Sequence, residues 1–185
     1  MFFQNIELYE TDKFQYLLIH KNGSTSIREC IKDLNPVVTN KINFSKVRWT
    51  VIREPFNRFI SGLKYDLKRH GLKQDEVNYD TFHNSRINLF SREKGDVNHS
   101  ASQVPYLINT HIDWYVEMKD LPTFLKMHFG KSEHLNQSDI SYKDPELGLE
   151  LDEPDVMKFL DLDYYIYKQI LGSRHLWKWQ QGKIF

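Results

Sequence analysis

Apolar and polar positions follow one another along this chain in blocks that predict an alternation of strands and helices. Residues 14–19 form a short apolar, aromatic-rich run, which predicts a buried strand. From Ser26 onward apolar residues recur at helical spacing until Asn35-Pro36 ends the pattern, and they are Ile27, Cys30, Ile31 and Leu34. Ser24 or Thr25 is in the right place to cap the start of this helix.

A second strand and helix are predicted further along. Residues 47–52 are rich in β-branched and aromatic side chains and predict a strand. Glu54 followed by Pro55 is typical of a helix start, and Gly71 is typical of its end. The apolar residues of this helix share one face, which predicts that they are buried; they are Phe56, Phe59, Ile60, Leu63 and Leu67.

The remainder of the chain, from residue 72 onward, has a less regular pattern. Residues 72–103 are polar and predict an irregular region with one helix around 81–90. The pattern predicts a strand near 111–116, a helix near 121–129 and a final helix over 155–171. We therefore expect one α/β domain over residues 1–185, with a mostly parallel central sheet and helices on both of its faces.

Composition limits the classes of function. Lys and Arg total 25 and Asp and Glu total 25, so 25 − 25 gives no net charge with His neutral. Broad electrostatic affinity for nucleic acid or for a membrane is therefore not expected. A single cysteine excludes an intramolecular disulfide, and we interpret Cys30 as a small core residue. No apolar run is long enough to span a bilayer and residues 1–7 do not resemble a signal peptide, so we expect a soluble, cytoplasmic protein.

The segment between the first strand and its helix has the chemistry of an anion site. The N–H groups and the dipole at a helix start favour a bound phosphate or sulfate. Gly23 allows close approach of the backbone, and Lys21 adds a full positive charge. The Walker A pattern of nucleoside-triphosphate enzymes is missing from the chain. The alternative is a buried strand followed by an ordinary helix with an incidental surface lysine.

A second strand-to-helix junction of the same kind strengthens the interpretation of the first as an anion site. Arg53 directly follows the strand over residues 47–52, and Ser61 lies two turns into the next helix. Ligands of open α/β sheets bind at the carboxyl ends of the strands. The two junctions together predict a site for two phosphate groups, although an isolated arginine at a strand end is more often an ion-pair partner.

Both junctions resemble known sequence motifs. Residues 21–26 (KNGSTS) resemble the phosphosulfate loop of the sulfotransferases that use PAPS, 3′-phosphoadenosine 5′-phosphosulfate. Residues 51–61 (VIREPFNRFIS) resemble the 3′-phosphate motif of that family, and the group that they resemble most is the Golgi carbohydrate sulfotransferases acting on heparan, chondroitin and dermatan. Weaker similarities follow in the same order at residues 98–103, 112–121, 134–138 and 161–167.

The resemblance implies a P-loop-like three-layer fold and transfer of a sulfuryl group from PAPS to a hydroxyl of a carbohydrate or other small-molecule acceptor, with PAP as product and no metal. Lys21 matches the catalytic lysine that stabilises charge on the leaving phosphate. Nucleic acid and membranes are not expected as partners. The implied cofactor-binding residues are Lys21, Asn22, Gly23, Ser24, Thr25, Ser26, Arg53 and Ser61.

The reaction also needs a proton acceptor, for which an imidazole is suited. His99 lies in the segment similar to the family's His-x-x-x-Gln element, in surroundings that predict an exposed loop. His70, at the end of the helix that carries Ser61, and His83 are rival candidates. In some related enzymes the base lies between the two phosphate motifs, but this chain has no histidine between Lys21 and Arg53. Two other functions remain open: a non-catalytic nucleotide- or glycan-binding module, and a small ATP-dependent kinase.

Overall fold

The computed structural model describes residues 6–70, 99, 102–108, 110–131, 143–144, 149–150 and 153–185. They belong to two compact units. The first, here called the sheet unit, comprises Met1–Arg53, Gln103–Asn136 and Tyr165–Phe185. The second, the α2 unit, comprises Glu54–Ser102 and Gln137–Tyr164.

The sheet unit is built around a sheet of five strands in the order β3-β1-β2-β4-β5. Its centre is parallel, because β4 pairs in parallel with both β2 and β5, whereas β1 is antiparallel to β2 and to β3. The expected α/β class is confirmed, but the parallel arrangement holds only for the three strands β2, β4 and β5. The strands are β1 (Leu8–Glu10), β2 (Phe14–Leu17), β3 (Val37–Thr39), β4 (Val47–Ile52) and β5 (Trp114–Glu117).

A tight turn explains the antiparallel pair that the sequence pattern did not predict. The N–H of Thr11 donates to the carbonyl of Phe14 at 2.9 Å, which closes the turn between β1 and β2. The Thr11 hydroxyl oxygen also accepts hydrogen bonds from the N–H groups of Lys13 (3.3 Å) and Phe14 (3.2 Å). A threonine that binds backbone groups two and three residues ahead stabilises such a turn. The chain therefore reverses here, and β1 lies beside β2.

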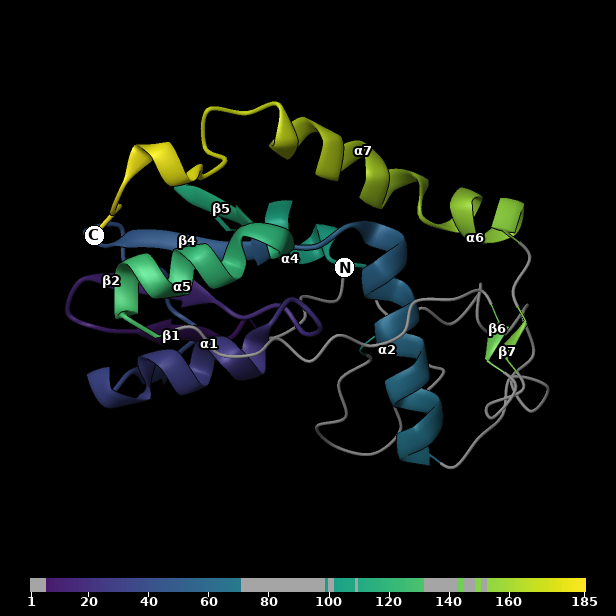
Figure 1. Cartoon of the computed structure of the whole chain (residues 1–185), viewed down its shortest axis with the longest axis horizontal. Coiled ribbons are helices and arrows are strands. Elements are labelled where there is room, and N and C mark those ends of the chain that lie inside the picture. Colours follow the sequence, from purple (N-terminus) through teal and green to yellow (C-terminus); the bar gives the residue numbers. More distant parts are fainter. Residues whose placement is uncertain are drawn as a thin grey trace. The chain divides into compact units, whose positions relative to one another are not determined.

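Helices cover both faces of this sheet (Figure 1). One face packs against α1 (Ser24–Ile31) and α5 (Leu121–Phe129), which follow β2 and β5 along the chain. The other face packs against α4 (Val104–Ile108) and the part of α7 (Asp161–Leu171) that belongs to this unit. Short 3-10 turns complete the unit: η1 (Lys32–Leu34), η3 (Met118–Asp120) and η5 (Trp179–Gln181).

The core on the α1 and α5 face is largely aromatic. Trp49 is fully buried, and its ring lies 4.7 Å from the rings of both Tyr16 and Phe124. Trp177, from the C-terminal segment, packs edge-on against Phe124 at 5.1 Å. Cys30 is buried in the same cluster, as the core interpretation required. Aromatic side chains bury large apolar areas, so this face holds much of the apolar burial of the unit.

Two details of the predicted helices are wrong. Leu34 is 49% exposed, because α1 ends at Ile31 and the 3-10 turn that follows changes the helical spacing. The final helix is in fact two helices, α6 (Glu153–Phe159) and α7, which are separated at Leu160. Asp161 and Asp163 lie in the first turn of α7, where acidic side chains favour a helix start.

The α2 unit contains α2 (Pro55–His70), α6, the first residues of α7 and a hairpin of β6 (Lys143–Asp144) and β7 (Leu149–Glu150). The start of α2 is as predicted, since the Glu54 carboxylate accepts the N–H groups of Phe56 (3.3 Å) and Asn57 (2.8 Å). The predicted core face of α2 is confirmed for four of its five residues, with Phe56 only half-buried; the four are Phe59, Ile60, Leu63 and Leu67.

Several sequence predictions lie outside the described residues: Gly71 as the end of the second helix, the irregular region from residue 72 to 98 with its helix around 81–90, and the similarity at 134–138. Among the helices that the structure describes, none combines the length and the apolar character that crossing a membrane requires.

Candidate functional site

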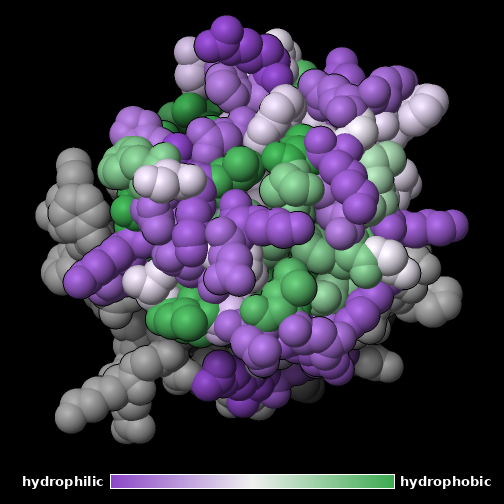
Figure 2. All heavy atoms as spheres, turned by 90° about the vertical axis from the view of Figure 1, so that its left-hand side faces the viewer, coloured by the Kyte–Doolittle hydropathy of each residue, from purple (hydrophilic) through white to green (hydrophobic). Residues whose placement is uncertain are grey.

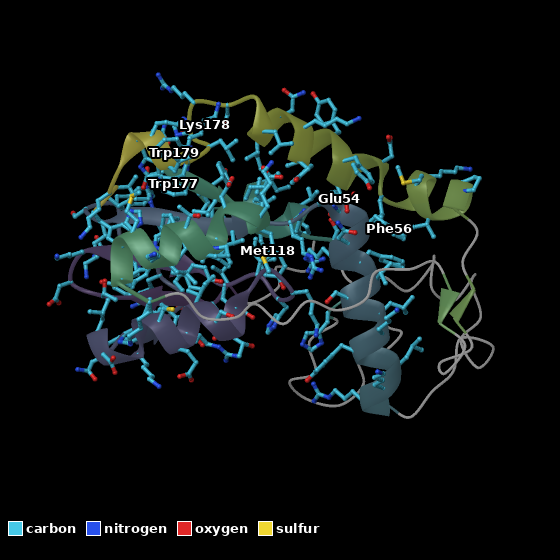
Figure 3. The ribbon with its side chains drawn as sticks, in the orientation of Figure 1. Glu54, Phe56, Met118, Trp177, Lys178 and Trp179 are labelled. Carbon is cyan, nitrogen blue, oxygen red and sulfur yellow. The ribbon has the colours of Figure 1, made fainter. Side chains whose placement is uncertain are left out.

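The loop between β2 and α1 has an unusual backbone. Lys21 has φ +66° and Gly23 has φ +75°, so two of three consecutive residues are left-handed. Only glycine adopts this conformation without steric cost. Gly23 also lies against η3 and α5: a Cβ added there would come within 2.5 Å of Leu121 Cδ2 and 3.4 Å of Met118 Sδ. Gly23 is therefore required by packing as well as by the backbone (Met118 is labelled in Figure 3).

The predicted cap of α1 is wrong. Ser24 and Thr25 are already inside the helix, and the N-cap position is taken by Gly23, which has no side chain to offer. No side chain of the described part of the chain caps α1. The start of α2 differs, because a carboxylate occupies it. The first N–H groups of a helix have no intrahelical partners, so the start of α1 is suited to an anion.

The side chains around this helix start differ in exposure. Thr25 is exposed, Lys21 and Ser26 are half-buried, and Ser24 is buried. A cationic group and two hydroxyl groups are therefore within reach of a ligand at the start of α1.

Asn22 has a positioning role in the structure. Its side chain is fully buried, and Nδ2 donates to the Val51 carbonyl at 2.7 Å and to Gln103 Oε1 at 3.1 Å. Gln103 in turn donates from Nε2 to the Arg53 carbonyl at 3.0 Å. This chain of hydrogen bonds ties the loop after β2 to the end of β4. The sequence pointed to Gln103 only as part of a similar segment, and its link to Asn22 joins residues 81 positions apart.

Arg53 completes the connection between the two predicted motifs. Its Nη1 donates to the carbonyl of Lys21 at 3.0 Å. The contact is possible because β2 and β4 are parallel neighbours, so the residues that follow them leave the sheet at the same edge. The structure thus brings the loop of residues 21–26 together with Arg53.

Glu117 is an acidic residue at the same edge that the sequence reasoning did not single out. It ends β5 and is paired in register with Ile52, which precedes Arg53. The Tyr167 hydroxyl donates to Glu117 Oε1 at 2.8 Å, and Lys119 Nζ lies 2.6 Å from Oε2. The hydrogen bond that Lys119 donates to Glu117 raises the pKa of Lys119. Glu117 therefore contributes negative charge at this edge of the sheet.

Ser61 and His99 belong to the α2 unit. His99 is only 8% exposed, so the prediction that it lies in an exposed loop is wrong. Its ring lies 4.4 Å from the ring of Tyr65, which covers one side of it. Ser61, which is half-buried, is four residues before Tyr65 on α2 and shares its face. The same face of α2 therefore carries Ser61 and the ring against which His99 packs.

The structure describes less of the two rival histidines than of His99. His83 lies outside the described residues, and only the backbone of His70, at the end of α2, is described. The choice between His99, His70 and His83 stays a prediction.

No family model matches the chain, and no match to it was found among curated proteins or among solved structures. The sulfotransferase resemblance therefore rests on the motifs themselves. Across the ranges that the structure describes, no three His, Cys, Asp or Glu side chains are grouped as a metal site requires.

Proposed function

We propose that this protein is a sulfotransferase of P-loop-like fold that moves the sulfuryl group of PAPS to a hydroxyl of an acceptor of the carbohydrate class. The observation that carries the proposal is the hydrogen bond between Arg53 Nη1 and the Lys21 carbonyl. It connects two motifs that lie 32 residues apart, at the carboxyl ends of adjacent parallel strands. Ligands of α/β proteins bind at this edge.

The residues of the loop fit the anionic end of such a cofactor. The start of α1 has no side-chain cap, so its first N–H groups are suited to phosphate or sulfate oxygens. Thr25 and Ser26 add hydroxyl donors, Gly23 and Ser24 contribute backbone N–H groups, and Asn22 holds the loop in place. PAPS, when bound, supplies the activated sulfuryl group. Lys21 then stabilises the negative charge that develops on the leaving phosphate.

Arg53 and Ser61 are proposed to bind the 3′-phosphate. A guanidinium forms charge-assisted hydrogen bonds with phosphate oxygens, and a serine hydroxyl adds a further donor. This phosphate distinguishes PAPS and PAP from ADP and ATP. A charge-assisted hydrogen bond contributes about 1.5–3 kcal/mol, so each lost contact weakens binding about ten- to hundredfold.

His99 is the proposed general base, which takes the proton of the acceptor hydroxyl. A neutral imidazole is suited to this step because its ordinary pKa lies near neutrality. The ring of Tyr65 packs against His99 at a ring distance of 4.4 Å, which restricts the positions of the imidazole. A restricted imidazole favours proton transfer, because the donor and acceptor atoms must come within hydrogen-bond distance.

Calorimetric titration with PAP, ADP and ATP is the first test of this function. We expect PAP to bind at least about tenfold more tightly than ADP, because only PAP carries the 3′-phosphate. The Ser61→Ala variant is expected to lose affinity for PAP while its affinity for ADP is unchanged. Lys32→Ala removes an exposed lysine at the far end of α1 and serves as the control for loss of charge.

The other results of the titration favour other functions. Equal affinity for PAP and ADP, or a preference for ATP, would contradict the proposal and favour the kinase. Absence of binding to all three nucleotides would favour a module without this cofactor. In a turnover assay with PAPS and a glycan acceptor, Lys21→Ala is expected to abolish turnover. If His70→Ala lowers turnover and His99→Ala does not, His99 is not the general base.

A further inference from the structure

The opposite edge of the sheet carries a hollow that the proposed function does not use. It has a volume of about 500 Å³ and lies where β4 and β5 begin, whereas the loop of residues 21–26 lies where β2 and β4 end. The strand residues from Arg48 to Ile52 separate the two edges by about 13 Å, at about 3.3 Å per residue. Small-molecule sites have volumes of about 300–1,000 Å³, so the hollow is large enough for a ligand.

A rigid carboxylate forms the polar centre of the hollow. Asp113 Oδ2 accepts the backbone N–H of Arg48 at 2.8 Å and Nε at 3.1 Å, and Oδ1 accepts Nη2 at 3.0 Å. The N–H of Asp113 also donates to the Arg48 carbonyl at 2.9 Å. The Arg48 side chain is 9% exposed and that of Asp113 is 41% exposed. Asp113 is thus held in one orientation, and part of it still faces solvent.

Two imidazoles and an aromatic ring line the same hollow. His175 Nδ1 lies 3.0 Å from the Asp113 carbonyl, which can only accept, so Nδ1 carries a proton, and in the neutral ring Nε2 is an acceptor. Phe44 is 71% exposed, and its ring lies 5.9 Å from the His111 ring and 5.0 Å from the Arg48 guanidinium carbon. An aromatic ring that is so exposed offers an apolar face to a ligand.

The charges and donors of the hollow decide between classes of ligand. An anion is disfavoured, because Asp113 compensates the charge of Arg48 and is itself the more exposed of the two. A metal ion is disfavoured, because within the described residues Asp113, His111 and His175 do not form a group that could hold one. Acceptors beside an exposed aromatic ring suit a ligand with hydroxyl donors and an apolar face. A neutral sugar ring has both of these features.

We propose that this hollow, lined by Phe44, Arg48, His111, Asp113, Tyr115 and His175, is a binding site for a neutral pyranose sugar. The sugar ring stacks on Phe44, and its hydroxyl groups donate to the Asp113 carboxylate and to His175 Nε2. Figure 2 shows the left-hand side of Figure 1, where β4 begins. On this face hydrophobic residues lie in small groups among hydrophilic ones.

The test is titration of the protein with glucose, galactose, cellobiose and lactose, followed by saturation-transfer and ¹H–¹⁵N NMR. We expect saturable binding of at least one sugar with a Kd on the order of 1 mM. Phe44→Ala is expected to weaken it about tenfold and His175→Ala to weaken it measurably. Trp179→Ala removes another aromatic side chain, 62% exposed and outside the hollow, and is expected to leave the affinity unchanged.

Three results overturn the proposal. They are the absence of saturable binding to every sugar, equal affinity of Phe44→Ala and the unaltered protein, and tighter binding of glucose 6-sulfate than of glucose. The titration needs neither PAP nor turnover, and Lys21→Ala is expected to bind the sugar normally. Failure of the proposed function and failure of this site are therefore separate results.

Discussion

Single residues of the loop after β2 contribute both to packing and to the proposed chemistry, and Gly23 is the clearest case. Its left-handed backbone would suit a site where a ligand approaches closely, and the Leu121 side chain would also have to shift to admit a larger residue. Asn22 likewise appears in the sequence beside a predicted anion site and in the structure as a buried anchor. Packing and the proposed chemistry therefore select the same residues here.

Replacement of Gly23 separates the packing effect from the backbone effect. Gly23→Ala is expected to lower the free energy of unfolding by about 2–5 kcal/mol, of which about 1–2 comes from the left-handed backbone and about 1–3 from the clash with Leu121. Gly130 is a matched control, because it has φ +69° but nothing within 4 Å of its added Cβ. Gly130→Ala should lose only about 1–2 kcal/mol. Urea unfolding measures both, and equal losses would show that the Leu121 contact costs nothing.

Among the elements, α5 and the C-terminal segment are joined by ring contacts and by the hydrogen bonds of one histidine. His128 Nδ1 donates to the Phe124 carbonyl at 3.0 Å, and Nε2 accepts the N–H of Ile184 at 3.0 Å. The ring stacks on Phe124 at 4.0 Å and lies 4.8 Å from the ring of Phe185. The Ile184 contact requires a neutral imidazole, and burial lowers the pKa of His128.

This contact predicts a dependence of stability on pH. Because the pKa of His128 is lower in the folded chain than in the unfolded chain, the unfolded chain takes up the proton first as the pH falls. The stabilisation is therefore fully present above about pH 6.5 and is lost as the pH falls through the folded pKa. Unfolding curves between about pH 8 and pH 5 measure it. In His128→Asn this part of the dependence should disappear, and parallel curves for the two proteins would contradict the assignment.

For the whole molecule, a ligand that binds only the folded chain raises its stability by mass action. PAP at a hundred times its Kd is expected to raise the free energy of unfolding by about 2.7 kcal/mol. The chain has no net charge, so this effect depends on local groups such as Lys21 and not on a general attraction for anions. Thermal unfolding with PAP, and with ADP at the same concentration, measures the difference.

Lys21→Ala should remove most of the rise in stability caused by PAP, and Lys32→Ala should keep it. A similar rise with inorganic sulfate alone would instead indicate a general anion effect.

Much of the fold was predictable because its signals are local. Periodicity and turn residues predicted β4 and α5 at their observed bounds, and the Glu54-Pro55 start of α2. The antiparallel pairing of β1 and β3 was not predictable, because both are strands of three residues with little pattern of their own. They are held by pairing partners and by the Thr11 turn.

The two sites likewise have features that the local sequence predicts and features that depend on the tertiary structure. The residue types of the loop at 21–26 and of Arg53 lie close together along the chain or at recognisable junctions, so their chemistry can be inferred from order and spacing. The contacts between them, the Gln103 link and the burial of His99 depend on which strands become neighbours. The hollow at the other edge joins Phe44, Asp113 and His175, which only folding brings together, because backbone pairing between β4, β5 and the C-terminal segment has no local signal in any one of them.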